Sequence, residues 1–178
     1  MKKFAFIDVN TQKCFVEHFG SKAIEDCPDI RENLMHLTEL GIKSGTPIMS
    51  PVYFGENCVK GSNDAAKTLD TETEDYVWEY EPNHAQYLVS HDDMESSGLE
   101  TVLNICKKMG VDTVFIYGVP LESSVRGLAL GLIGKVDKVW VVKDCVKGYT
   151  DEQVVLDELK EAGVKLLTTR SLDKFVNL

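Results

Sequence analysis

Short apolar runs without polar alternation recur along this chain, and amphipathic segments separate them. The runs are Lys3–Ile7, Ile48–Met49, Tyr87–Val89, Thr113–Tyr117, Lys138–Val142 and Val164–Leu167. Strands of this kind are buried on both faces, which happens in parallel sheets that carry helices on either side. The pattern therefore predicts an α/β protein with three layers, α/β/α, around a mostly parallel sheet of about six strands.

The amphipathic segments supply the helices of this arrangement. One begins at Pro28 and closes at Gly45 and Pro47, and one that includes Leu99 and Cys106 stops at Gly110. Two more are expected over residues 122–133 and 151–162. Residues 52–84 are less regular and end in an acidic stretch, TLDTETEDYVWEYEP. We expect this segment to be an insertion folded over one edge of the sheet.

Size, charge and cysteine content limit the functional classes. A chain of 178 residues fits one domain, residues 1–178. Its net charge of −10 would repel a phosphate backbone or an anionic membrane, so neither nucleic acid nor membrane is an expected partner. No apolar stretch approaches the roughly 20 residues of a membrane span, and no signal-peptide core is evident. Five scattered cysteines indicate reduced thiols and a cytoplasmic protein.

Two polar sites are expected to meet at the carboxyl edge of the sheet. With strand order 3-2-1-4-5-6, the first and fourth strands are neighbours at the point where the order reverses, which is where such folds bind ligands. Asp8 follows a buried strand and could move protons there, or it could cap the turn through Asn10. Ser124 lies in a first helical turn that could stabilise an oxyanion, although Ser123 and Ser124 could also be helix caps.

Four blocks in this order resemble the isochorismatase-like cysteine hydrolases, which include nicotinamidases, N-carbamoylsarcosine amidases and isochorismatases. "FIDVNTQKCFV" resembles the family motif "DVDTQxDFM", and "FGENCVKGSNDAAKTLDT" resembles "FPPHCVxGTPGQxKIPET". "GVPLESSVRGLALGL" is similar to "GVATDYCVxxAxxGL", and "VVKDC" is similar to "VVxDA". The resemblance runs through nearly the whole chain, and it implies a six-stranded parallel sheet.

The resemblance also implies a catalytic triad of Asp, Lys and Cys, in which the thiolate attacks an amide carbonyl. Asp8 matches the aspartate, and Ser124 falls on the cysteine. A cis peptide is implied after Gly118, at Val119-Pro120, and the oxyanion hole falls on the amides around Pro120 and on Ser124. Proline has no N–H, so only flanking amides could donate.

Two departures from the family pattern concern cations. The family lysine belongs near the end of the third strand, where "QYLVSHDDMES" has none. His91 is the only cation-capable side chain of that block, and it could also be an ordinary loop histidine. The nicotinamidase metal motif falls on "SPVYFGEN", whose Val52, Phe54 and Asn57 cannot replace it. We therefore expect no zinc or iron site, and the lack of a GxGxxG or P-loop motif after a strand predicts no nucleotide cofactor.

Three hypotheses follow for the function. The first is a hydrolase of a small amide or related compound, with Asp8 as base and Ser124 as nucleophile or water-positioning group. The second is an inactive relative that binds a small molecule or a protein partner in the same crevice. The third is a structural subunit that associates through residues 70–81. Homo-oligomers are common in the family, and Trp78 with Tyr80 is the expected contact between copies.

Overall fold

The computed structural model describes residues 3–68, 86–91, 94 and 98–176, and these residues form one parallel six-stranded sheet. The strand order is β3-β2-β1-β4-β5-β6, and every neighbouring pair is parallel. This confirms the predicted fold and strand order. The strands are β1 (Phe4–Val9), β2 (Ile48–Tyr53), β3 (Gln86–His91), β4 (Thr113–Gly118), β5 (Lys138–Val146) and β6 (Lys165–Leu167).

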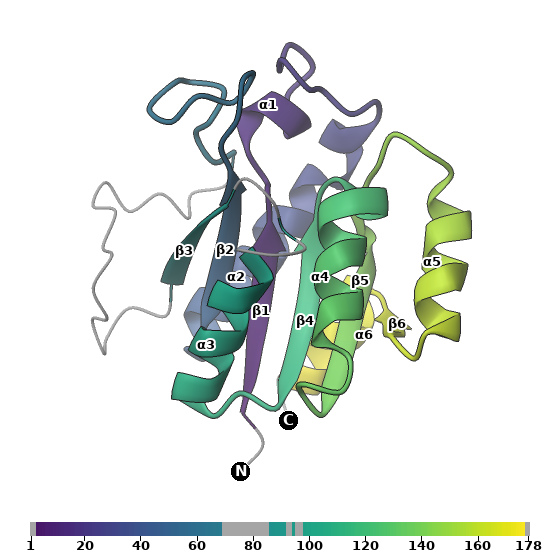
Figure 1. Cartoon of the computed structure of the whole chain (residues 1–178). Helices are drawn as coiled ribbons and strands as arrows, with labels where there is room; N and C mark the ends of the chain where they lie inside the picture. Colours follow the sequence, from purple (N-terminus) through teal and green to yellow (C-terminus); the bar gives the residue numbers. More distant parts are fainter. Residues whose placement is uncertain (1–2, 69–85, 92–93, 95–97, 177–178) are drawn as a thin grey trace.

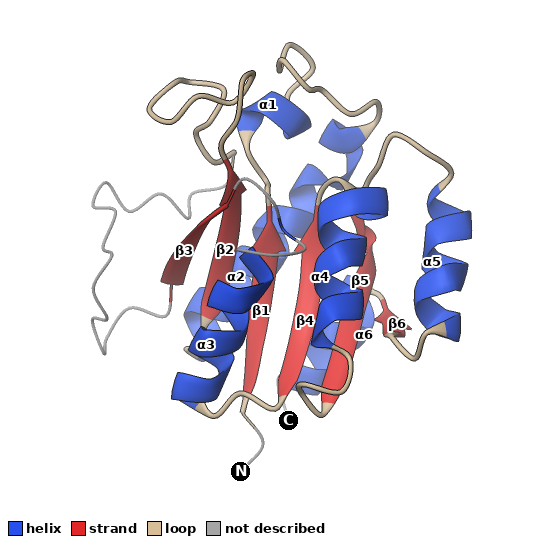
Figure 2. Cartoon of the chain, in the orientation of Figure 1, coloured by secondary structure: helices blue, strands red, loops and turns tan. Residues whose placement is uncertain are grey.

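Helices cover both faces of the sheet (Figures 1 and 2). One face carries α3 (Leu99–Met109), α4 (Arg126–Leu132) and α5 (Glu152–Glu161), and the other carries α2 (Arg31–Ser44) and α6 (Thr169–Val176). The short helix α1 (Lys13–Val16) lies above the carboxyl ends of the strands, and a 3₁₀ turn (Cys27–Ile30) leads into α2. None of the helices in this described part of the chain is long and apolar enough to span a bilayer.

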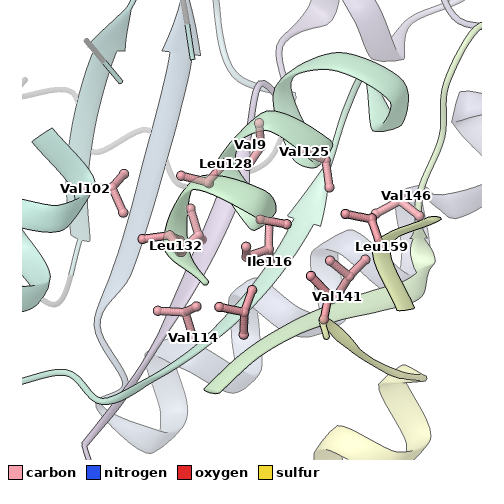
Figure 3. Close-up of a cluster of buried hydrophobic side chains, with 14 of the residues drawn as sticks. Val9, Val102, Val114, Ile116, Val125, Leu128, Leu132, Val141, Val146 and Leu159 are labelled. Atoms are coloured by element: carbon pink, nitrogen blue, oxygen red, sulfur yellow. The ribbon is translucent and has the colours of Figure 1, made fainter. Parts of the chain in front are cut away.

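In β1, β2, β4, β5 and β6, alternate side chains enter two separate apolar cores. In β1, Ile7 and Val9 join the core under α3, α4 and α5, whereas Phe6 joins the core under α2 and α6. Figure 3 shows the first core, in which Val9 and Ile116 pack with Leu128 of α4. Because both faces are covered, a strand that is apolar at every position is stable only in the middle of such a sandwich. This explains the apolar runs of the sequence.

Several elements differ in extent from the sequence prediction. The strand predicted at Ile48–Met49 continues to Tyr53, although Ser50 and Pro51 disfavour strands, because β3 pairs with it along its whole length. The strand predicted to end at Val142 continues to Val146. The helix predicted over 122–133 begins as a π turn, Leu121–Val125, before α4. Helix α6 was not predicted, and the acidic segment with Trp78 and Tyr80 lies outside the described residues.

Candidate active site

The carboxyl ends of β1 and β4 lie side by side and bring the two predicted polar segments together. Asp8 is the register partner of Tyr117, and Val9 is the partner of Gly118. Gly118 has a φ of 113°, and a Cβ there would overlap the carbonyl oxygen of Val9, so only glycine fits this position. The Val119-Pro120 bond that follows is cis, as the family resemblance implied.

Asp8 is fully buried at this edge, and both of its carboxylate oxygens accept hydrogen bonds. Lys67 Nζ donates to Asp8 Oδ2 at 2.6 Å, and Thr11 Oγ1 donates to Asp8 Oδ1 at 2.7 Å. Lys67 Nζ also donates to Thr11 Oγ1 at 2.5 Å, which closes a triangle of three buried groups. A carboxylate this deep in the protein needs such partners, because water no longer stabilises its charge.

Lys67 reaches Asp8 because the connection between β2 and β3 is bound to the segment that follows β1. Lys13 N donates to the carbonyl oxygen of Ala66 at 2.9 Å, and Thr68 N donates to that of Thr11 at 2.8 Å. Gln12 and Lys67 form an antiparallel bridge between these hydrogen bonds. The backbone on both sides of Lys67 is therefore held against the end of β1.

The buried side chain of Gln12 joins three segments around this bridge. Its Nε2 donates to the carbonyl oxygens of Tyr53 at 2.9 Å and Ala65 at 3.0 Å. Its Oε1 accepts a hydrogen bond from the backbone N–H of Tyr53 at 2.8 Å. These bonds connect the end of β2 and the Lys67 segment to the turn after β1, so the position of Lys67 depends on Gln12.

Ser124 lies in the π turn after β4 and contacts the segment that follows β1. Asn10 Nδ2 donates to Ser124 Oγ at 3.0 Å. Ser124 is half-buried, whereas its neighbour Ser123 is exposed. The structure therefore places Ser124 next to the segment that follows Asp8.

The amides that flank Pro120 already have partners within the turn. Val119 N donates to the carbonyl oxygen of Val9 at 2.9 Å, and Leu121 N donates to that of Lys147 at 2.8 Å. These two groups therefore brace the turn, and an oxyanion would have to use donors further along the first turn. Ser123 and Ser124 are the predicted residues at those positions, where N–H groups lack partners within the helix.

Lys67 is the site residue that sequence reasoning missed. The family resemblance predicts the lysine near the end of β3. There His91 lies opposite Tyr53, and only the backbone of His91 is described. The expectation that no lysine accompanies Asp8 is corrected by the ion pair between Lys67 and Asp8. One signal was present, because the block "CVKGSNDAAKT" carries Lys67 where the matching family motif also has a lysine.

The residues at the family's metal position do not form a ligand set. Val52 and Phe54 offer no donor side chain, and Asn57 lies in an exposed turn. Across the part of the chain that the structure describes, no three His, Cys, Asp or Glu side chains are grouped so that they could hold a metal ion. The zinc or iron of a nicotinamidase therefore has no matching site among these residues.

The five cysteines are all buried free thiols. Burial raises the pKa of Cys106 to about 11 and that of Cys27 to about 12, and it also raises the pKa values of Cys14, Cys58 and Cys145. A thiol in such surroundings remains protonated and reacts slowly. None of these cysteines has the character of a nucleophile that replaces the one absent at position 124.

One known protein family matches this chain in sequence. An isochorismatase domain matches residues 4–171. No protein of curated function matches the chain in sequence.

Solved structures of low identity share the fold. A pyrazinamidase of Pyrococcus horikoshii in complex with zinc superposes with a TM-score of 0.78 at 21% identity, over 93% of this chain and 99% of that one. An isochorismatase family protein from Desulfovibrio vulgaris gives a TM-score of 0.82 at 15% identity, over 100% of both chains. A nicotinamidase from Bacillus subtilis gives 0.76 at 14% identity, over 92% of this chain and 98% of that one. With the domain match over nearly its whole length, this chain belongs to the isochorismatase family.

Proposed function

We propose that this protein is a hydrolase that cleaves a small amide or a related compound at the carboxyl edge of its sheet. Asp8 is the general base, Ser124 is the nucleophile in the position of the family cysteine, and Lys67 holds Asp8 in place. The observation that carries the proposal is the buried ion pair of Lys67 and Asp8. Asp8 precedes Asn10 by two positions in the sequence, and Asn10 contacts Ser124. Replacing a buried charge pair with apolar residues is often neutral or stabilising, so stability alone does not explain why the chain carries this pair.

The first half of the reaction would form an ester on Ser124. Asp8 accepts the hydroxyl proton while Oγ bonds to the carbonyl carbon, and the carbonyl electron pair moves onto oxygen. The amides of Ser123 and Ser124 donate to this oxyanion. The C–N bond then breaks, and Asp8 passes the proton to the departing amine.

The second half would release the acid. Water gives a proton to Asp8 and attacks the ester carbon, after which the bond to Oγ breaks and Oγ recovers the proton. The sum is one amide and one water converted to one carboxylic acid and one amine. Each oxygen of Asp8 accepts one described hydrogen bond, and a carboxylate oxygen has a second lone pair that can receive a proton.

The experiment measures ammonia or product release from nicotinamide, N-carbamoyl amino acids and isochorismate. The native protein is compared with Asp8→Asn, Lys67→Met and Ser124→Ala, and Ser171→Ala on the surface of α6 is the control for loss of a hydroxyl group. We expect native turnover that falls by roughly 10²–10⁴-fold in Asp8→Asn. Ser171→Ala should keep native activity.

A different outcome would favour the alternative function. If folded native protein and a Ser124→Cys variant both leave every compound of the panel intact, the hydrolase proposal fails for this substrate class. A calorimetric titration with the same compounds would then test for an inactive relative that binds a small molecule.

The proposal extends to the state of the protein in the cell. We propose one isochorismatase-like domain over residues 1–178, acting as a cytoplasmic homo-oligomer on a small molecule rather than on nucleic acid. The support is the set of five free thiols, the acidic charge of −10 and the common assembly of the family. An elution volume that matches a monomer would contradict the oligomer.

A further inference from the structure

We infer that Asn10 is a positioning residue that donates a hydrogen bond to the Ser124 hydroxyl oxygen, so that the hydroxyl proton points away from Asn10 and negative charge on that oxygen is stabilised. The inference rests on the proposed function of Ser124 as nucleophile. It adds a residue to which neither the resemblance nor the domain match gives a role.

The contact joins two distant parts of the chain at the carboxyl edge of the sheet. Asn10 Nδ2 lies 3.0 Å from Ser124 Oγ, and the two residues are 114 positions apart in sequence. Asn10 is 1% exposed, so its side-chain amide is shielded from solvent. A buried N–H that bonds to a hydroxyl in a partly buried place contributes more than a surface contact would.

The backbone of Asn10 is fixed in an uncommon conformation that aims this side chain. Its φ is 50°, in the left-handed region where asparagine is enriched among residues other than glycine. Asn10 N donates to the carbonyl oxygen of Pro51 at 2.8 Å, and its own carbonyl oxygen accepts from Gln12 N at 2.7 Å. Such a conformation persists where its surroundings determine it, and it is frequent in functional sites.

The chemistry of the two groups sets the direction of the bond. The nitrogen of an amide side chain only donates, whereas a serine hydroxyl has one proton and two lone pairs. When Oγ accepts from Asn10, its own proton must point elsewhere and can go to a base. As the proton leaves, the same N–H stabilises the growing negative charge on Oγ.

A thiol introduced by Ser124→Cys reports this effect without any need for turnover. We would measure the pH dependence of its alkylation by iodoacetamide and identify the modified peptide by mass spectrometry. The native cysteines are buried, and their raised pKa values keep the background low. The variants Asn10→Gly and Asn10→Asp are made in this background, because glycine and aspartate both tolerate the positive φ of Asn10.

Loss of the donor should make the introduced thiol less acidic. Asn10→Asp presents a carboxylate in place of the N–H, and we expect about a tenfold smaller thiolate fraction at neutral pH, or one pKa unit. Asn10→Gly should also lower the thiolate fraction of the introduced thiol, but by less. Asn104→Asp, on the exposed surface of α3, adds the same charge and should leave alkylation unchanged.

Activity gives the second readout. With Ser124 present and a substrate found, Asn10→Asp should lower kcat while KM stays close to native, because the donor acts mainly as charge develops on Oγ. Equal alkylation of the introduced thiol with Asn10, with Asn10→Gly and with Asn10→Asp would overturn the inference. A shifted thiol in a protein that hydrolyses nothing would support the donor role of Asn10 and refute only the hydrolase.

Discussion

At the scale of single residues, the buried pair of Asp8 and Lys67 is difficult to explain by its contribution to stability. The side chain of Asp8 is 0% exposed and that of Lys67 is 5% exposed, so both charges have lost nearly all their water. An apolar pair of the same shape would often be as stable or more stable, which makes a stability role a weak explanation for these charges. The proposed role of Asp8 as general base would explain them instead.

Removal of one charge of this pair should destabilise the fold strongly. We expect Lys67→Met to lower the free energy of unfolding by about 3–5 kcal/mol, because the carboxylate of Asp8 remains buried without its cation. The double variant Asp8→Asn with Lys67→Met should recover most of this loss. Denaturant unfolding followed by circular dichroism measures both.

Lys43→Met is the matched control for this prediction. Lys43 pairs with Glu39 at 3.0 Å, but the two side chains are 74% and 58% exposed. Such surface pairs contribute little, and the free energy of unfolding should stay close to that of the native protein. Equal losses in the two lysine variants would show that the Asp8 pair is not buried in solution.

At the scale of elements, the turn from β4 to α4 brings Ser124 to Asn10. Gly118 allows the chain to pass close to Val9, and the bonds of Val119 and Leu121 fix the turn to β1 and to the segment after β5. The π turn Leu121–Val125 then carries Ser124 near its end. The serine is therefore placed by the geometry of the turn more than by its own contacts.

Gly118→Ala should damage this turn. The added Cβ meets the Val9 carbonyl and forces a φ that alanine rarely adopts, so we expect a loss of at least about 1–3 kcal/mol. In Gly134→Ala the φ of 73° is also positive, but nothing lies within 4 Å of the new Cβ. Thermal unfolding of the two variants should show the larger decrease in Tm for Gly118→Ala, and the reverse order would contradict the close approach to Val9.

At the scale of the whole molecule, two tightly packed cores shield the thiols. Cys106 lies in the core under α3 to α5, whereas Cys14, Cys27, Cys58 and Cys145 lie in the other core. With the pKa of Cys106 raised to about 11, its thiolate is rare near neutral pH. We expect all five thiols to resist a disulfide reagent in the native protein and to react quickly in denaturant.

The raised pKa of Cys106 predicts that the free energy of unfolding decreases at alkaline pH. The pKa of the Cys106 thiol is higher in the folded protein than its ordinary value of 9.0, so the folded state keeps this proton when the unfolded state loses it. The contribution of this thiol to the free energy of unfolding is complete below pH 9.0 and is lost as the pH rises through about 11. Cys106→Ala should show a smaller decline than the native protein, and equal pH profiles would contradict a buried neutral thiol.

The sequence by itself determined the architecture and half of the site. Apolar runs without alternation can be stable only between two layers of helices, and this physical requirement predicted the sheet and its faces. Asp8 and Ser124 could be placed at one edge, because residues that follow parallel strands meet at the carboxyl end of the sheet. Gly110 and Gly45 marked the ends of α3 and α2 correctly.

Only the tertiary structure decided which groups accompany Asp8 and Ser124. Lys67 lies in a connection without regular spacing. Its segment is held near Asp8 by backbone bonds of Ala66 with Lys13 and of Thr68 with Thr11, and by the side chain of Gln12. The sequence around Asn10 is typical of a turn. Its hydrogen bond to Ser124, however, depends on the pairing of β1 with β4. The local sequence pattern predicts which face of the sheet a residue occupies. Contacts between irregular segments depend instead on which hydrogen bonds the buried polar groups form in the packed chain.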